Sequence, residues 1–194
     1  MKTIDYYNQN ADQFVASTFH VAMGELYQPF INHLSDCAII LDLGCGTGRD
    51  SLAFKKLGYQ VEAIDFSEEL VAKAKGLTGI NVRQQSFYEL DEQDKYHGIW
   101  ACASLLHCDR ENLADVMLRI LNALKVNGIL YMSFKYGESD REKDGRAFTD
   151  LNEQQAQDLL NQLEGFQPLK QWITVDQRPD REEEWLNLLW KKHA

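Results

Sequence analysis

The sequence predicts an α/β fold in which a doubly wound, seven-stranded sheet carries helices on both faces. Three observations support this prediction. Short apolar runs alternate with helical patterns along most of the chain, which is typical of a parallel sheet. A glycine-rich turn directly follows the first apolar run. The last two apolar runs have no helix between them and therefore suit an antiparallel hairpin at one edge, so that the last strand is antiparallel.

The length of the chain favours one domain. Its 194 residues are 44% hydrophobic, enough for one core, and they contain neither a linker nor an internal repeat. We therefore expect a single domain over residues 1–194. Within it, an N-terminal helical lid covers residues 1–35, and the α/β core covers residues 36–194.

Composition narrows the choice of partners. The formal net charge of −10 disfavours duplex nucleic acid, because an acidic protein repels phosphates at long range. No apolar stretch approaches the roughly 20 residues that cross a bilayer, and the first residues lack the apolar run of a signal peptide. We expect a cytoplasmic protein without a membrane partner. Cys37, Cys45, Cys102 and Cys108 lack metal-finger spacing, so reduced thiols and no metal site are expected.

The first half of the chain begins with a helical pattern over residues 6–33, in which Pro29 caps or kinks the second piece. A nearly continuous apolar run over residues 38–43 then predicts a buried strand. Further strands are expected over residues 61–65 and 81–85, and helices over residues 51–57 and 68–75.

The second half continues the alternation. Residues 111–124 form a long amphipathic pattern, which predicts a helix that Asn127-Gly128 ends. A polar, charged loop is expected over residues 135–150. The other elements expected here are strands over residues 98–103, 129–134, 169–175 and 185–190, and a helix over residues 152–163.

The glycine-rich turn and a later acid form a nucleotide-binding pattern. Gly44, Gly46 and Gly48 let the backbone approach a ligand closely, and Asp65 ends the next strand. Asp65 lies 65 − 46 = 19 positions after Gly46, close to the spacing at which an acid accepts hydrogen bonds from ribose hydroxyls. Arg49 stands where the dinucleotide fingerprint has its third glycine, which disfavours NAD.

Four ordered motifs resemble those of class I S-adenosylmethionine-dependent methyltransferases, which have a Rossmann-like fold. They are LDLGCGTGR at residues 41–49, AIDFS at 63–67, GIWACASLLH at 98–107 and LKVNGIL at 124–130. The fourth departs from the family's L-K-P-G-G turn at Val126 and Asn127. YNQNA at residues 7–11 also resembles a lead-in that is common in small-molecule members.

The resemblance implies that S-adenosylmethionine is the cofactor and S-adenosylhomocysteine the product. It implies that Asp42 reaches the cofactor's ammonium, that Asp65 holds its ribose hydroxyls and that Phe66 lies along its adenine. The residues expected to contact the cofactor are Tyr7, Asp42, Gly44, Cys45, Gly46, Arg49, Asp65, Phe66, Ser67, Ser86, Phe87, Ala103, Ser104 and Leu105.

Several of these residues have a purely structural alternative. Asp65 could cap the next helix, and Asp42 could serve a local turn. Phe66 and Phe87 could be core aromatics, and Tyr7 could be a packing residue.

Methyl transfer from a sulfonium is an in-line displacement, so the protein mainly aligns the reactants. His107 follows the fourth strand at the edge where ligands bind, and it could act as a base or contact the acceptor. Its alternative is a helix-entry histidine without a chemical role. Lys135, Arg146 and Arg178 lie near the expected acceptor pocket and favour an anionic acceptor. Their alternative is a solvated loop with internal ion pairs.

The sequence thus predicts methyl transfer to a small-molecule acceptor, because the sheet elements leave little chain for a recognition domain. The alternatives are methylation of an RNA or protein side chain and a non-catalytic cofactor-binding module. The absence of an N/D-P-P-Y-type motif after residue 103 argues, by family resemblance, against amino methylation of nucleic-acid bases. The acceptor's identity, the atom methylated and the oligomeric state stay open.

Overall fold

The computed structural model describes residues 3–178 and 181–193. Its helices are α1 (Thr3–Gln9), α2 (Ala11–Thr18), α3 (Gly24–Ile31), α4 (Arg49–Lys56), α5 (Glu68–Thr78), α6 (Leu113–Ala123) and α7 (Glu153–Asn161). Short 3-10 turns are η1 (Phe87–Glu89), η2 (Leu105–His107) and η3 (Arg110–Asn112). Its strands are β1 (Ile39–Leu43), β2 (Gln60–Asp65), β3 (Val82–Gln84), β4 (Tyr96–Ala101), β5 (Leu124–Lys135), β6 (Asp140–Lys143), β7 (Arg146–Thr149), β8 (Phe166–Val175) and β9 (Glu184–Lys192).

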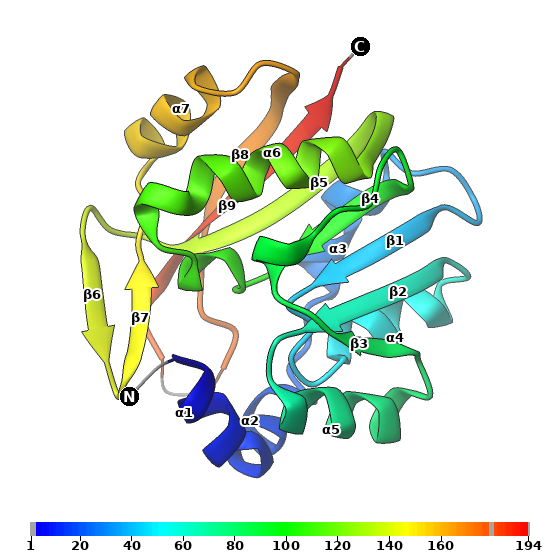
Figure 1. Cartoon of the computed structure of the whole chain (residues 1–194), viewed down its shortest axis with the longest axis vertical. Helices are drawn as coiled ribbons and strands as arrows, with labels where there is room; N and C mark the ends of the chain where they lie inside the picture. The colour runs from blue at the N-terminus through cyan, green and yellow to red at the C-terminus, as the bar shows by residue number, and fades with distance from the viewer. Residues whose placement is uncertain (1–2, 179–180, 194) are drawn as a thin grey trace.

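The main sheet has seven strands in the order β3-β2-β1-β4-β5-β9-β8 (Figure 1). Strands β1 to β5 pair in parallel, whereas β9 runs antiparallel to both of its neighbours, β5 and β8. This arrangement confirms the predicted doubly wound sheet with an antiparallel last strand. The order reverses beside β1, so the carboxyl ends of β1 and β4 lie side by side, where ligands bind in open α/β sheets.

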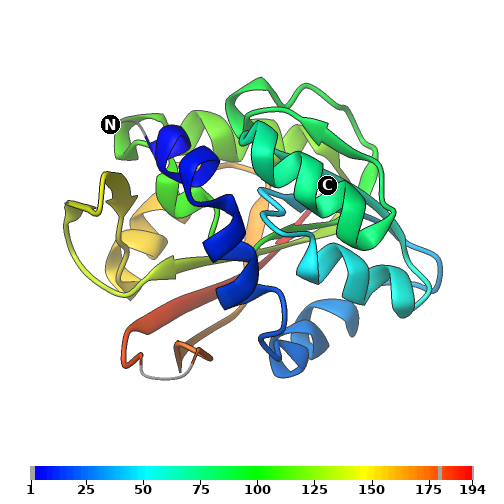
Figure 2. The same ribbon diagram turned by 90° about the horizontal axis from the view of Figure 1, so that it is seen from below.

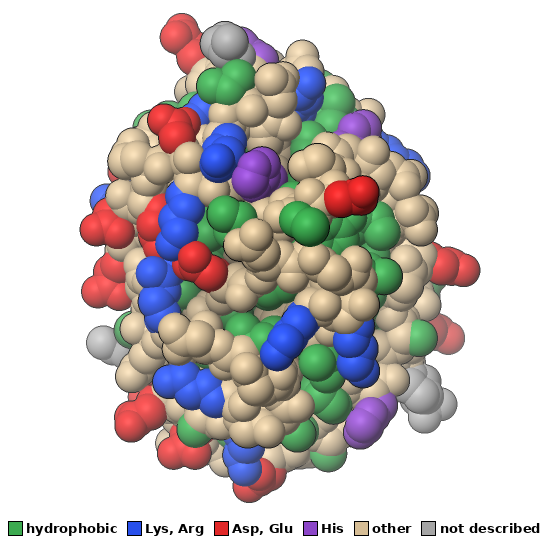
Figure 3. Space-filling model, turned by 90° about the vertical axis from the view of Figure 1, so that its right-hand side faces the viewer, with side chains coloured by type: hydrophobic (Ala, Val, Ile, Leu, Met, Phe, Trp, Pro, Cys, Tyr) green, Lys and Arg blue, Asp and Glu red, His purple; other side chains and the backbone are tan. Residues whose placement is uncertain are grey.

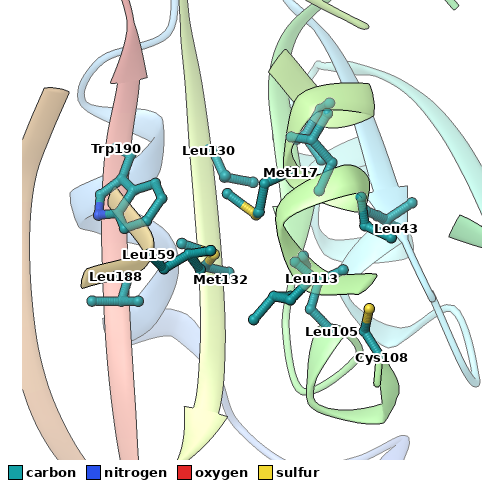
Figure 4. Packing of buried hydrophobic residues seen from close by; sticks show 14 of the residues in the cluster. Leu43, Leu105, Cys108, Leu113, Met117, Leu130, Met132, Leu159, Leu188 and Trp190 are labelled. Atoms are coloured by element: carbon teal, nitrogen blue, oxygen red, sulfur yellow. The ribbon is translucent and has the colours of Figure 1, made fainter. Parts of the chain in front are cut away.

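Alternating residues of the central strands feed hydrophobic clusters on opposite faces of the sheet. Leu41 of β1 and Ile99 of β4 belong to the cluster beneath α6 and α7 (Figure 4). Ile40 and Trp100 point the other way, into a cluster with α3 and α4, and α5 packs on the same face beside β2 and β3. Because both faces are covered, the strands read as continuous apolar runs.

One expected boundary in the sequence was wrong, and the helical lead-in proved to have three pieces. The helical pattern of residues 6–33 forms three separate helices, α1 to α3, and Pro29 lies inside α3. The long amphipathic helix ends at Ala123, not at Asn127-Gly128, because Leu124 already pairs with Tyr96 of β4 as the start of β5.

The segment of residues 135–150 is not simply a polar loop. It contains the hairpin β6–β7, in which Lys143 pairs with Arg146 across a two-residue turn. Asp144 and Gly145 form that turn with φ of 54° and 75°. An Asp-Gly pair with positive φ at both residues is a favoured hairpin turn. The hairpin matters because Arg146 and Phe148 project from it into the candidate site.

Helices α1 and α2 lie across the carboxyl-end side of the sheet, between the hairpin β6–β7 and α5 (Figure 2). The backbone N–H of Ala147 donates to Oγ1 of Thr3, and Oγ of Ser67 donates to the side-chain oxygen of Asn8. This stretch of chain is therefore anchored to β7 at one end and to the start of α5 at the other.

Within residues 3–178 and 181–193, no helix is both long and apolar enough to cross a membrane. On the face shown in Figure 3, Lys and Arg side chains are interspersed with Asp, Glu and hydrophobic side chains.

Candidate cofactor and acceptor site

The glycine-rich turn is held against the ends of two neighbouring strands. The backbone N–H groups of Gly44 and Cys45 both donate to the carbonyl of Ile64, at 2.9 Å. Gly44 has a φ of 77°, and a Cβ added there would lie 2.5 Å from Cβ of Ser104. Only glycine fits this close approach, because a side chain would collide with the chain that follows β4. The turn therefore has one fixed position.

A cavity of about 600 Å³ opens beside this turn. Its walls come from the glycine turn, α1, η2, the hairpin β6–β7 and the ends of β8 and β9. The residues of the sequence prediction that line it are Tyr7, Asp42, Gly44, Cys45, Gly46, Arg49, Ala103, His107, Lys135, Arg146 and Arg178. The structure thus brings the expected methionine end of the cofactor and the expected acceptor residues into one cavity.

The other predicted cofactor residues lie outside this cavity. The ring of Phe14, from α2, lies over Gly46, 3.2 Å from where a Cβ would be. The side chain of Leu105 is fully buried in the core beneath α6, so it offers only backbone to a ligand. The predicted residues that do not line the cavity are Asp65, Phe66, Ser67, Ser86, Phe87, Ser104 and Leu105.

Asp65 braces the local backbone. Its Oδ2 accepts from the N–H of Gly46 at 2.8 Å, and its Oδ1 accepts from the N–H of Ser67 at 2.9 Å. Burial raises the pKa of Asp65, and these backbone hydrogen bonds oppose the rise. The N-cap of α5 is Ser67, so the bond to Asp65 stabilises the turn before this helix and is not its cap. Each carboxylate oxygen keeps a second lone pair, so the same contacts are compatible with ribose binding.

The serine and phenylalanine residues on this side differ in exposure. Phe66 is 52% exposed and is therefore not a core aromatic, whereas Phe87 packs against the large core cluster. Ser67 caps α5 through Leu70, and Ser86 caps η1 in a reciprocal box with Glu89. Ser104 donates from Oγ to the carbonyl of Leu43 at 2.6 Å.

Asp42 and Asp50 form a buried acidic pair beneath the turn. Burial and the neighbouring Asp50 raise the pKa of Asp42 to about 8, and Ser51 donates to Asp42 at 2.5 Å. Asp50 also loses solvent, but the guanidinium of Arg49 lowers its pKa overall. Arg49 meets Asp50 through Nε at 2.6 Å. The charge of Arg49 is therefore matched within the protein, although its side chain lines the cavity.

His107 has a defined protonation pattern. Its Nδ1 lies 2.7 Å from the carbonyl oxygen of Ala147, and its Nε2 lies 2.8 Å from the hydroxyl of Tyr7. A carbonyl can only accept, so Nδ1 carries the proton and Nε2 accepts from Tyr7. Burial, Arg146 and Lys135 lower the pKa of His107 to about 4. Burial raises the pKa of Tyr7 to about 12.

Cationic side chains line the opposite part of the cavity. Lys135 lies 5.3 Å from the ring centre of Phe148 and 5.5 Å from that of Trp185, and its Nζ meets Glu183 at 2.5 Å. Burial lowers the pKa of Lys135. Arg178 is paired with Asp176 through both guanidinium Nε, at 2.9 Å, and a terminal nitrogen, at 2.5 Å.

The cationic side chains in this part of the cavity are paired with carboxylates to different degrees. Among the described residues, Glu183 is the acidic partner of Lys135, of Lys143 at 3.7 Å and of Arg181 at 3.9 Å. Within the same part of the chain, the acidic partner of Arg146 is Asp144, at 3.4 Å. The alternative of internal ion pairs therefore fits Arg178 and Lys135 at 2.5 Å and Arg146 at 3.4 Å.

Sequence reasoning missed several residues of the site. Asp50 also accepts hydrogen bonds from Tyr27 at 2.7 Å and from Nε1 of Trp100 at 2.9 Å. Asn187 accepts at 2.7 Å from the hydroxyl of Tyr131, which also lines the cavity. These contacts join residues that are 23 to 56 positions apart, so no local sequence pattern predicts them.

Residues 40–128 match the family model described as a methyltransferase domain. An uncharacterized methyltransferase of Staphylococcus carnosus is 26% identical over 119 residues, which is 60% of this chain and 58% of that protein. The ribosomal protein L11 methyltransferase of Campylobacter fetus subsp. fetus is 32% identical over 118 residues, which is 56% of this chain and 38% of that protein. The matches therefore span less than two thirds of these relatives.

The whole fold has similar solved structures. One is a Burkholderia thailandensis 1,6-didemethyltoxoflavin-N1-methyltransferase with bound 1,6-didemethyltoxoflavin and S-adenosylhomocysteine. It is 23% identical, with a TM-score of 0.78, and the match covers 98% of this chain and 85% of that one. Over residues 40–128 the chain is thus similar to class I S-adenosylmethionine-dependent methyltransferase domains, and its whole fold is similar to that of a solved methyltransferase. Residues 40–128 are the part of the chain that carries the family match.

Proposed function

We propose that this protein transfers a methyl group from S-adenosylmethionine to a small, anionic acceptor. The observation that carries the proposal is the single cavity of about 600 Å³, which is lined by both the glycine turn and the group of His107, Lys135 and Arg146. This size lies within the usual range for small-molecule sites. When bound, the cofactor supplies an electrophilic methyl group for displacement by a nucleophilic atom of the acceptor.

The residues around the turn fit the cofactor. Gly44 and Gly46 leave backbone where side chains would protrude, and the buried carboxyl of Asp42 lines the cavity beside them. Asp65 keeps lone pairs for hydroxyl donors. The exposed ring of Phe66 lies next to Asp65, outside the cavity, and offers an apolar surface for a flat base. A cofactor held at both places passes beneath α1 and α2, so these helices act as its cover.

The acceptor part supports an anionic ligand. Three cations share the carboxylate of Glu183, and Arg146 is incompletely paired, so an incoming anion gains favourable charge contacts. His107 contacts the acceptor in this proposal, and Lys135 and Arg146 hold its charge. Arg178 positions the wall of the cavity and does not bind the acceptor, because its charge is already paired with that of Asp176.

Methylation of a macromolecule is the competing proposal, since one relative is named for a ribosomal protein substrate. The cavity walls favour the small acceptor. Helix α1, the hairpin β6–β7 and residues 176–178 and 181–183 line the same cavity as the acceptor residues, which leaves little room for a folded partner. A protein that binds the cofactor and methylates nothing is the third possibility.

Calorimetric titration with S-adenosylhomocysteine tests the cofactor part. We expect saturable binding that Asp65→Ala weakens at least about tenfold. The control is Asp94→Ala, at an exposed ion pair away from the cavity. Absence of binding by the wild-type protein would refute the proposal.

The acceptor part is tested by release of S-adenosylhomocysteine in the presence of pooled anionic metabolites, pooled cationic metabolites, or ribosomes and RNA. Turnover with the anionic pool supports the proposal. Turnover only with ribosomes or RNA favours the macromolecular alternative, and turnover with none supports the non-catalytic module.

A further inference from the structure

The hydrogen-bond pattern around His107 restricts what the acceptor can present to it. Nδ1 donates to the carbonyl of Ala147, so Nε2 has only a lone pair to offer. In the present structure the hydroxyl of Tyr7 fills that place as a donor. Any group that replaces Tyr7 at Nε2 must bring its own N–H or O–H, because a buried acceptor left without a donor costs about 1–3 kcal/mol.

Arg146, in contrast, needs a hydrogen-bond acceptor from the ligand. Its Nε is buried and has no hydrogen-bond partner among the described residues, while a terminal nitrogen lies 3.4 Å from Asp144. The guanidinium lies 4.2 Å from the ring centre of Tyr6, which fixes its plane. Its charge lowers the pKa of His107, and its charge and a side-chain hydrogen bond both lower the pKa of Tyr7, although burial raises that pKa overall. Arg146 therefore offers an unused donor to an acceptor atom beside His107.

The surroundings of these two groups are aromatic. The cavity is lined by the rings of Tyr6, Tyr7, Phe148 and Trp185, and the ring of Phe148 lies 5.0 Å from that of His107. Aromatic walls with polar groups at the edge favour a planar conjugated ligand.

We propose that the methyl acceptor is a planar conjugated ring that carries an N–H or O–H next to a carbonyl or carboxylate oxygen. The N–H or O–H meets Nε2 of His107, and the oxygen takes the donor of Arg146. The inference rests on the proposed function, since it names the substrate class of the same cavity. It disfavours thiolates and metalloid oxyanions that have no hydrogen to give to Nε2.

In the methyl transfer, one bond of the acceptor and one bond of the cofactor break, and every electron pair and proton has a destination. The acceptor's N–H or O–H bond breaks, and its proton goes to Nε2 of His107. The electron pair of that bond stays on the acceptor atom and forms the bond to the methyl carbon. The sulfur–carbon bond breaks, and its electron pair stays on sulfur, which leaves as the neutral thioether. His107 becomes an imidazolium and returns its proton to solvent.

Binding of matched ring compounds to the protein saturated with S-adenosylhomocysteine tests this proposal without turnover. Salicylate and 2-pyridone carry the donor beside the oxygen. In 2-methoxybenzoate and N-methyl-2-pyridone a methyl group replaces the donor hydrogen. We expect calorimetry to show that each donor compound binds at least about tenfold more tightly than its methylated counterpart.

Two variants assign that preference to residues. His107→Phe should abolish the preference for the donor compound, and Arg146→Met should weaken salicylate at least about tenfold, while both keep their affinity for S-adenosylhomocysteine. His33→Phe, at an exposed position, and Arg119→Met, at a half-buried one, both away from the cavity, should change neither. Retained cofactor affinity shows that a variant is folded.

Equal binding of the donor and methylated compounds would overturn the proposal, and so would failure of both donor compounds to bind a protein that holds S-adenosylhomocysteine. A preference that His107→Phe leaves intact would also overturn it. Failure to bind S-adenosylhomocysteine is a different result, because it refutes the proposed function itself.

Discussion

The side-chain oxygen of Asn8 accepts a hydrogen bond of 2.6 Å from Oγ of Ser67, the residue that caps α5. This contact joins the N-terminal helices to the strand–helix turn that follows Asp65. It therefore closes the region between the cavity and the exposed ring of Phe66, through which the cofactor must pass in the proposed function.

Loss of this contact should speed the movement of the cofactor. We expect Asn8→Ala to raise both the association and the dissociation rate of S-adenosylhomocysteine several-fold, measured by stopped-flow fluorescence. Asp12→Ala is the control, because its exposed ion pair with Lys73 links the next helix, α2, to α5 but contributes little. Unchanged rates in Asn8→Ala would show that this bond does not limit entry.

Gly44 should tolerate no side chain. The Cβ of Gly44→Ala would lie 2.5 Å from Cβ of Ser104, and the φ of 77° adds backbone strain. We expect a loss of about 1–3 kcal/mol in the free energy of unfolding and weaker binding of S-adenosylhomocysteine. The control is Gly76→Ala in α5, where nothing lies within 4 Å and helix propensity favours alanine. Chemical denaturation of both variants measures the difference.

Asp42 should make the protein less stable as the pH rises. Its pKa is raised from 3.8 to about 8, chiefly by burial, so the folded state holds a proton that the unfolded state releases between these values. Stability contributed by the protonated form therefore declines as the pH rises through this window. In Asp42→Asn, which cannot ionise, we expect a flatter dependence between pH 5 and 8. Parallel melting curves for the two proteins would contradict the shift.

His107 should make the protein less stable as the pH falls. Its pKa falls from 6.5 to about 4, mainly through burial, so the unfolded state takes up a proton between these values and the folded state does not. Stability is therefore lost as the pH falls below about 6.5, by up to roughly 1.4 kcal/mol per pH unit. His107→Gln should lose this dependence, whereas the exposed His20→Gln should keep it. Denaturation series at pH 4.5, 5.5 and 6.5 separate the two results.

The sequence predicted the sheet because its strands are covered on both faces, and such strands leave continuous apolar runs. The glycine turn and Asp65 were also predictable, since a fixed spacing along the chain places them together. The turn pair Asp144-Gly145 could have predicted the hairpin β6–β7. The charged residues around this pair instead led to the prediction of a loop.

The acceptor side was less accessible to sequence reasoning. Tyr7 and His107 are one hundred positions apart, and Lys135 and Glu183 are 48 apart. Neither pair shares an element whose period would indicate a contact. The positive charges of Arg178 and Arg146 can be read from the sequence, but their partners cannot. The sequence therefore does not reveal that Arg178 is paired with Asp176, whereas Arg146 keeps an Nε–H without a partner among the described residues.

The position of Trp185 gives the protein an optical signal of its own. This indole lines the cavity, with Lys135 on its face and Nε1 at 3.4 Å from Asp176. Trp190 does not line the cavity and packs against Phe166, with ring centres 5.6 Å apart. A conjugated compound entering the cavity would quench the emission of Trp185 and leave that of Trp190 as an internal reference. Libraries of unlabelled compounds can therefore be screened in the native chain without an attached dye.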